Sequence, residues 1–384
     1  MSEWKTVRLG DVFDLQMGKT PDRKRVDYFQ GAHKWISIAD ISKSEKYISE
    51  TKECLTDEAI ASNGIKSIPK DTVIMSFKLS IGKTAITSDE MYSNEAIMAF
   101  IPNGKYEIDN SFLYHLFSNK DWSEGSNKAV KGITLNKVSL SDAKISLPSL
   151  KTQKQIATQL DKCASIIAKY KQMLEKYDTL IKSRFIEMFG DPVINEKKWE
   201  LKTLPELGDF GRGVSKHRPR NAPELLGGKY PLIQTGDVAN ANLYITEYNS
   251  TYSELGFKQS KMWKSGTLCI TIAATIAKTA ILTFDSCFPD SVVGFTPNEK
   301  TNVLFINYWF TFFQRILEEQ APAVAQKNIN LQILSELKII NPPLDLQNDF
   351  ASFVQQIDKS KFAVKKSLEK AETLYKSLIQ KHFG

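Results

Sequence analysis

Two Gly-Lys-Thr tripeptides, Gly18-Lys19-Thr20 and Gly82-Lys83-Thr84, look like the end of a phosphate-binding loop. Such a loop needs a further glycine five residues earlier, so that the backbone can approach the phosphates closely. Those positions hold Phe13 and Phe77. The sequence therefore predicts no nucleotide site at either tripeptide.

Asn341-Pro342-Pro343-Leu344 is similar to the Asn-Pro-Pro-aromatic motif of amino-methyltransferases, in which the aromatic ring stacks on a flipped base. Leu344 has no ring, and no glycine-rich turn for a methyl donor precedes it. We interpret these prolines as the entry to a helix. Pro21-Asp22 with Glu50-Thr51-Lys52 fits the acidic pattern of metal-dependent nucleases loosely and has no counterpart later in the chain. We therefore expect no catalytic residues.

Basic side chains gather at two matching places, each just after a Leu-Gly-Asp element, at 9–11 and 207–209. Arginine suits phosphate oxygens and guanine edges because its planar fork donates two parallel hydrogen bonds. A lone charge run is usually solvated surface, but two runs at matching places favour a binding role. Two further lysine pairs also match, and Gln234 is either an adenine reader or a strand-end hydrogen-bonding group. We predict DNA contacts at Lys19, Arg23, Lys24, Arg25, Lys83, Lys131, Arg212, Lys216, His217, Arg218, Arg220, Gln234, Lys278 and Lys327.

Charge and composition limit the class of protein. The 384-residue chain has a net charge of +7, but residues 1–148 are neutral and residues 191–342 carry only +1, whereas residues 149–190 carry +4 and residues 343–384 carry +2. The four cysteines form no CxxC pair and the four histidines are scattered, so we expect no metal site, no disulfides and a cytoplasmic location. No signal peptide is recognisable, and the apolar runs are too short to cross a membrane.

Two stretches with heptad spacing must position these groups. Apolar residues step by four and three through 150–188, and the same pattern returns 194 positions later. Such a narrow stripe packs along another helix. Lys361 is the polar exception, in a position that fixes register or leaves room for another chain. We predict helix–helix packing at Ile156, Leu160, Ile167, Leu174, Ile181, Phe350, Val354, Ile357, Val364, Leu368 and Tyr375.

The rest of the chain is duplicated with the same period. Residues 71–86 align without gaps to residues 266–281, and both copies close on Phe-Gly. Each copy reads as a strand-rich region followed by one long helix, and the helix expected at 302–317 precedes the second long helix. We predict an α+β fold with two pseudo-twofold-related globular regions joined by two long antiparallel coiled-coil helices. The predicted segments are 1–148, 149–190, 191–342 and 343–384.

The order of these motifs resembles the specificity subunits of type I restriction-modification systems. The resemblance is carried by residues 213–220 and 227–238, by the commoner 18–21 and 35–40, and by the helix entries at 148–156 and 342–347. It implies that 1–148 and 191–342 are target recognition domains, each reading half of a split site in double-stranded DNA. It also implies that the two helices are the family's conserved spacer regions.

The same resemblance implies that this chain is not an enzyme. Two modification subunits would dock on the helices and methylate adenine with S-adenosylmethionine, and restriction subunits would use ATP and Mg²⁺. All three cofactors are thus expected on partner subunits and none in this chain. A stand-alone coiled-coil DNA-binding regulator is the alternative, although a duplicated chain already contains its own partner helix.

Overall fold

A computed structural model describes residues 4–78, 80–122, 127–129, 132–217, 219–273, 276–313, 315–316 and 329–384. Its contacts divide the chain into two compact units. Unit 1 comprises Met1–Lys171 with Lys366–Gly384, and unit 2 comprises Gln172–Lys365. Each unit therefore holds one globular region together with parts of both long helices.

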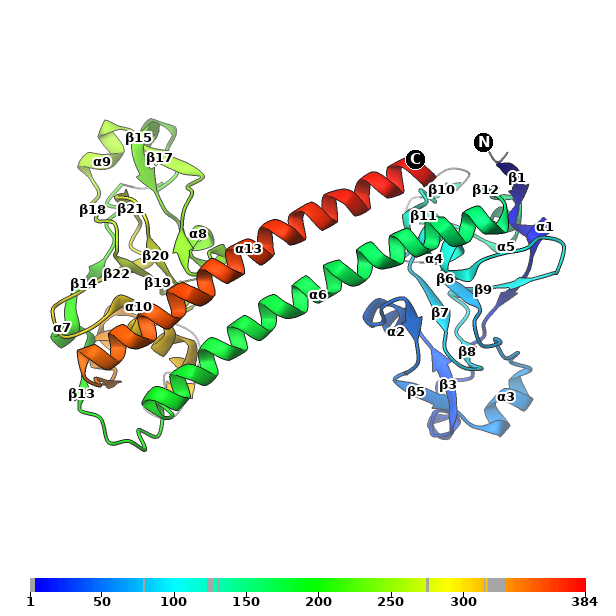
Figure 1. Ribbon diagram of the computed structural model, residues 1–384, viewed down its shortest axis with the longest axis horizontal. Coiled ribbons are helices and arrows are strands. Elements are labelled where there is room, and N and C mark those ends of the chain that lie inside the picture. The colour runs from blue at the N-terminus through cyan, green and yellow to red at the C-terminus, as the bar shows by residue number, and fades with distance from the viewer. Residues whose placement is uncertain are drawn as a thin grey trace. The chain divides into compact units, whose positions relative to one another are not determined.

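Unit 1 is built on two sheets (Figure 1). The larger has the order β2-β9-β6-β7-β4, and its strands are Phe13–Met17, Ile97–Pro102, Val73–Ser76, Thr84–Thr87 and Tyr47–Ile48. The smaller has the order β5-β3-β8, with strands Glu53–Leu55, His33–Ile36 and Tyr92–Ser93. Two strand pairs complete it: β1 (Lys5–Arg8) with β12 (Lys144–Leu147), and β10 (Asn127–Ala129) with β11 (Gly132–Thr134).

Unit 2 repeats the strand order of the larger sheet and has a fourth strand in the smaller one. Its larger sheet has the order β14-β22-β19-β20-β16, with strands Gly208–Arg212, Val292–Pro297, Leu268–Thr271, Thr279–Leu282 and Tyr244–Ile245. Its smaller sheet has the order β17-β15-β21-β18, with strands Ser250–Tyr252, Leu226–Leu232, Ser286–Cys287 and Met262–Trp263. The pair β13 (Leu201–Lys202) with β23 (Ile339–Ile340) matches β1 with β12.

Short helices connect these strands. Those of unit 1 are α1 (Leu9–Val12), η1 (Val26–Phe29), α2 (Ile38–Lys43), α3 (Asp57–Asn63), α4 (Asn110–Asn119) and α5 (Lys137–Asp142). Those of unit 2 are α7 (Leu204–Leu207), η2 (Pro223–Leu225), α8 (Thr235–Asn240), α9 (Glu254–Lys258), α10 (Val303–Trp309), η3 (Phe310–Phe312) and α12 (Leu331–Glu336). Several begin at a side chain that accepts a backbone hydrogen bond, as Ser37 does for α2 and Thr56 does for α3.

The two long helices are α6 (Leu150–Phe189) and α13 (Leu344–Phe383), and they pair antiparallel. In unit 1 the start of α6 contributes Ile156 and Leu160 to a core that the end of α13 contacts through Tyr375. In unit 2 the end of α6 and the start of α13 share a core that contains Phe185 and Phe350. Toward these ends the stripe residues Ile156, Leu160, Ile181, Phe350 and Val354 are buried, whereas the half-buried ones are Ile167, Leu174, Ile357, Val364, Leu368 and Tyr375.

The polar position in the stripe is occupied by an ion pair. Lys361 is 9% exposed, and its Nζ lies 2.6 Å from a carboxylate oxygen of Asp178 on α6. Both residues lie in unit 2. Of the two explanations that the sequence left open, a contact that fixes helix register is the one that this geometry supports.

The α+β class and the antiparallel helix pair agree with the sequence prediction, and the strand-rich region expected before the first long helix contains β6, β7 and β9. The helix expected at 302–317 is present with one irregularity: α10 ends at Trp309, the tighter turn η3 follows, and helical backbone resumes at Phe313 and at residues 315–316. Three predicted DNA contacts, Lys131, Arg218 and Lys327, lie outside the described residues.

Candidate nucleic-acid interface

The basic loop of unit 1, residues 18–25, follows β2 and already faces carboxylates. Arg23 Nη1 donates to both carboxylate oxygens of Glu53 at 2.8 and 2.9 Å. Its guanidinium carbon also lies 4.3 Å from the Phe29 ring centroid and 4.8 Å from that of Trp35. Arg23 is thus held between two rings and an acid, as a structural arginine is.

Arg25 is held in the same way. It pairs with Asp27 at 2.6 Å and with Glu58 at 3.1 Å, and its guanidinium carbon lies 4.2 Å from the Tyr28 ring centroid. The hydrogen bonds that it donates to Asp27 and Glu58 raise the pKa of the guanidinium above its ordinary value. Both arginines of this loop are therefore charge-compensated within unit 1.

The two lysines of the same loop, Lys19 and Lys24, form fewer side-chain interactions than the arginines. Lys19 Nζ donates to the backbone oxygen of Asn63 at 2.5 Å, and the backbone amide of Lys24 donates to Asp22. Next to them Thr20 donates a hydrogen bond to Glu95, which lowers the pKa of that carboxyl against the effect of burial. Acidic side chains therefore line this loop alongside the basic ones.

The equivalent loop of unit 2 follows β14 and is different. Arg212, Lys216, His217 and Arg220 are all exposed. Arg220 forms an ion pair with Asp290. Among the residues that the structure describes, no ion pair joins Arg212 or Lys216 to a carboxylate. This loop thus keeps uncompensated positive charge at the surface.

Tertiary structure adds two lysines that sequence reasoning missed. Gln259 Oε1 accepts hydrogen bonds from the backbone amides of Lys216 at 2.5 Å and His217 at 3.0 Å. The flanking Lys258 and Lys261 are exposed. They lie some forty positions away along the chain, so no local pattern could have linked them to the loop.

The lysine pair Lys83 and Lys278 occupies equivalent hairpins. In unit 1 the backbone amide of Lys83 donates to Ser76 Oγ at 3.2 Å, and in unit 2 that of Lys278 donates to Thr271 Oγ1 at 3.0 Å. Lys83 Nζ in turn donates to Ser42 Oγ at 2.5 Å, at the end of α2. The hairpins are matched, but a DNA role for these lysines stays a prediction.

Gln234 precedes the first residue of α8. Its backbone amide donates to Asp237 Oδ2 at 2.8 Å, and its side-chain amide donates to Ser250 Oγ at the longer distance of 3.4 Å. The side chain is exposed. The geometry thus supports a local hydrogen bond and leaves base reading as a prediction.

One buried glutamine per unit ties a globular region to the start of a long helix. In unit 1 Gln153 accepts from the backbone amide of Asp109 at 2.9 Å and donates to the Pro148 carbonyl at 2.9 Å. In unit 2 Gln347 accepts from Asn302 at 2.9 Å and donates to Pro342 at 2.8 Å. Both glutamines follow a proline by five residues, which is the signal that could have identified them.

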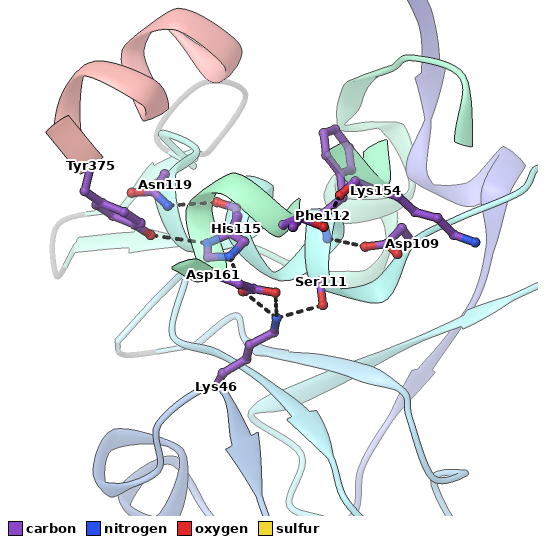
Figure 2. Close-up of polar contacts among 10 residues, drawn as sticks. Lys46, Asp109, Ser111, Phe112, His115, Asn119, Lys154, Asp161 and Tyr375 are labelled. Carbon is purple, nitrogen blue, oxygen red and sulfur yellow. Dashed lines mark hydrogen bonds and ion pairs between the residues drawn. The ribbon is translucent and has the colours of Figure 1, made fainter. Parts of the chain in front are cut away.

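A second polar junction occurs in unit 1 (Figure 2). His115 on α4 is 1% exposed and bonds Asp161 on α6 through Nε2 at 2.8 Å and the Tyr375 hydroxyl on α13 through Nδ1 at 3.2 Å. Lys46 Nζ lies 2.6 and 2.7 Å from the Asp161 oxygens and 2.7 Å from Ser111 Oγ. A groove of about 880 Å³ is lined by Lys46, His115, Asp161 and Tyr375.

Two opposing effects set the pKa values in this junction: desolvation by burial, and interactions with neighbouring charged groups. Burial lowers the pKa of His115 below 6.5, although Asp161 opposes the shift. Burial also acts to raise the pKa of Asp161, but hydrogen bonds from Lys46 and His115 outweigh it and lower the pKa. The folded state thus favours a neutral imidazole beside an ionised carboxylate.

Two structural observations bear on chemistry and location. The described residues contain no group of three or more His, Cys, Asp or Glu side chains that could hold a metal ion. Within the same residues, no helix has both the length and the apolar character needed to span a bilayer.

Solved structures share this fold. The chain matches a crystal structure of the S subunit of a type I restriction-modification system from M. genitalium with a TM-score of 0.61 and 14% identity, covering all of this chain and 96% of that one. A chain from a structural study of complex assembly and conformational transition in a type I restriction-modification system matches with a TM-score of 0.58 and 18% identity, covering 99% and 97%.

The family follows from the sequence match. Residues 1–176 and 196–373 each match the type I restriction modification DNA specificity domain, so the chain belongs to that family and carries its domain twice.

Curated relatives include the Type I restriction enzyme MjaIX specificity subunit of Methanocaldococcus jannaschii, which is 26% identical over 68% of this chain. The match spans 63% of that relative's length. The EcoDI specificity subunit of Escherichia coli is 24% identical over 99% of this chain and 88% of its own length.

Proposed function

We propose that this chain is the sequence-specificity subunit of a type I restriction-modification complex. Each globular region reads one part of a bipartite site in double-stranded DNA. The observation that carries the proposal is the duplication: one topology occurs in both units, while the exposed loops after β2 and β14 differ in sequence and charge. A shared scaffold with different surfaces suits two different half-sites.

In this proposal the chain targets the chemistry and performs none. Two modification subunits bind S-adenosylmethionine and methylate adenine, and restriction subunits use ATP and Mg²⁺. The two units present equivalent helix starts, each anchored by a buried glutamine, and such a repeated surface suits two copies of one partner. A stand-alone DNA-binding regulator has no comparable support from the family match.

The test is to co-express this chain with its candidate modification subunit in a host that lacks DNA methylation, and to sequence the genomic DNA for N6-methyladenine. We expect a split motif: two different short sequences separated by a fixed gap of unspecified bases. The control is the modification subunit expressed alone, which should leave the genome unmethylated.

Two outcomes contradict the proposal. A continuous methylated motif would mean that one recognition domain is silent. An intact complex that methylates nothing would favour the stand-alone regulator. Restriction activity is a separate question, tested by challenging the host with unmethylated phage DNA.

A further inference from the structure

We propose that unit 2 supplies most of the electrostatic grip on the DNA backbone, through a phosphate-binding surface made by Arg212, Lys216, Lys258 and Lys261. This inference rests on the proposed function. It adds Lys258 and Lys261 to the predicted DNA contacts, and it assigns more phosphate contacts to unit 2 than to unit 1. The sequence is nearly neutral in both globular regions, so local clusters rather than overall charge must provide the attraction.

Hydrogen bonds hold the two segments of this surface together. Gln259 accepts from the backbone amides of Lys216 and His217, and Ser260 Oγ donates to the Val214 carbonyl at 2.9 Å. Lys258 and Lys261 flank these two anchoring residues directly. The two segments that carry the four basic residues are therefore joined before any ligand arrives.

The support beneath them is rigid. Lys261 Nζ lies 3.8 Å from the centroid of the Trp263 ring, which stacks on Phe288 with centroids 5.0 Å apart. Gly213 and Gly294 pack so closely on this pair that an added Cβ would lie 2.2 Å from the Phe288 oxygen and 2.5 Å from the Trp263 ring, respectively. Rigid placement lowers the entropy that a phosphate contact would otherwise cost.

Unit 1 holds different residues at the equivalent places. Met17 pairs with Met98 at the end of β2, and Arg212 pairs with Val293 at the end of β14, so Met17 is the counterpart of Arg212. Met17 is 47% exposed. The end of α3 carries Asn63, where the end of α9 carries Lys258. Two of the four positive charges of unit 2 are thus absent from unit 1.

The arginines that unit 1 does have are engaged with acids. A phosphate approaching Arg23 meets Glu53, and one approaching Arg25 meets Asp27 and Glu58. Each phosphate would therefore have to displace a carboxylate or accept its repulsion, which removes most of the gain from charge neutralisation. Unit 2 offers basic groups that carry no such cost at Arg212 and Lys216.

Salt dependence of binding measures this difference directly. Each neutralised phosphate contributes about −0.9 to the slope of log affinity against log salt on duplex DNA. A fourfold rise in salt thus weakens binding roughly 3.5-fold for each contact. A phosphate-contact variant weakens binding to matched and mismatched duplexes by the same factor, unlike a base-reading variant.

The experiment uses the full chain assembled with its modification subunit, and measures affinity for a target duplex from about 50 to 200 mM salt. The unit 2 variant is Arg212→Met, Lys216→Ala, Lys258→Asn and Lys261→Ala together, with two of these changes copied from unit 1. The matched unit 1 variant is Lys19→Ala, Arg23→Ala, Lys24→Ala and Arg25→Ala. Thermal melting of each variant checks that it remains folded. Arg23 packs on two rings, so its loss can destabilise unit 1. If the fourfold unit 1 variant melts early, the double variant Lys19→Ala with Lys24→Ala replaces it.

We expect the unit 2 variant to flatten the slope by about 3 to 4 and the unit 1 variants by at most about 2, because the two arginines of that loop are already paired with carboxylates and only its two lysines can contribute fully. The reciprocal change Met17→Arg should steepen the slope by about 0.9. Equal flattening by the two sets, or a wild-type slope in the unit 2 variant, would overturn this inference alone. A wild-type complex that binds no duplex would overturn the proposed function, and this inference with it.

Discussion

Units 1 and 2 are built alike inside and differ where they face solvent and where the long helices meet them. Both have the same strand order in the larger sheet and the same buried glutamine at the helix entry. On the surface, both arginines of the basic loop of unit 1 are compensated by acids, whereas the loop of unit 2 keeps exposed charge at Arg212 and Lys216.

The contacts between the long helices and the globular regions also differ between the two units. Unit 1 joins α4, α6 and α13 through the polar junction of His115, Asp161 and Tyr375. Unit 2 joins the equivalent elements through packed rings, with Phe185 stacked on Phe305 at 5.5 Å and in edge contact with Phe350 at 5.4 Å. The features that both copies keep are those that the scaffold requires, and those that diverged give each half its own surface and its own response to pH.

The largest expected effect tests the shared feature. Gln153→Met or Gln347→Met should lower the free energy of unfolding by about 2–4 kcal/mol, because each leaves buried backbone groups without partners. Gln347→Met should cost at least as much, since Gln347 also accepts from buried Thr301 at 3.0 Å. Denaturant unfolding of the full chain measures this loss. The exposed residues Gln155 and Gln356 serve as controls, and costs for the buried pair no larger than theirs would refute the anchoring role.

The next prediction uses the polar junction of unit 1, which has no counterpart among the described residues of unit 2. Above pH about 6.5 His115 is neutral in both folded and unfolded chains. As the pH falls below that value the unfolded chain gains a proton that the folded chain binds only at its lower pKa, so unit 1 loses stability. The Asp161 contribution is retained until the pH falls below 3.8 toward the lowered folded pKa, so it does not act in the same range.

Hydrogen exchange of α4 between pH about 7 and 5, corrected for intrinsic rates, should therefore show loosening that α10 does not show. His115→Gln keeps a donor and an acceptor but does not titrate, and should remove the effect. His382→Gln is the control variant, because burial and Lys381 also lower the pKa of His382, which lies in the same unit. Unchanged pH dependence in His115→Gln would contradict this account.

A smaller effect separates the two members of the ion pair in unit 2. Asp178→Ala should cost about 1–2 kcal/mol, because it leaves the buried ammonium of Lys361 without its carboxylate. Lys361→Ile, which copies the unit 1 residue Ile167, should change stability by less than about 1 kcal/mol, because Asp178 is 60% exposed and remains hydrated. Thermal melting compares the variants, and an equal cost for both would show that the pair itself, not burial of one charge, matters.

The smallest effect concerns two backbone positions with positive φ. Gly82 of unit 1 has φ +88°, and its counterpart in unit 2 is Ala277 with φ +57°. Gly266 of unit 2 has φ +87°, and its counterpart is Asp71 with φ +57°. Ala277→Gly should stabilise by up to about 1 kcal/mol and Asp71→Gly by less, because aspartate tolerates this conformation better.

The reverse change Gly82→Ala should destabilise by about 1 kcal/mol, since its Cβ would also lie 3.1 Å from the Trp122 ring. Melting temperatures of the single variants decide the matter. A destabilising Ala277→Gly would mean that the left-handed backbone at that position carries no strain.

Sequence was sufficient for the features that repeat along the chain. The long helices could be predicted because heptad spacing is a local pattern with a single packing solution. The central strands could be predicted from short apolar runs between turn residues, as for β6 and β19. Apolar spacing within 302–317 did not register the change to a tighter turn after Trp309, where η3 interrupts the helix.

The candidate interface was only partly predictable. Sequence located the basic loops, since like charges next to one another are visible in one dimension. It could not show that Glu53 and Glu58 lie against Arg23 and Arg25, because those carboxylates come from β5 and α3. The same holds for Lys258 and Lys261, which reach their loop through Gln259 and Ser260.

The sequence by itself determined the duplication, the helix pair, the fold class and the family. Each of these depends on spacing or order along the chain, which survives in one dimension. Tertiary structure decided which basic residues are neutralised and which remain free, that His115 meets Asp161 and Tyr375, and that Lys361 is buried against Asp178. Electrostatic energies depend on distance and burial in space, and the packing of distant segments alone sets both.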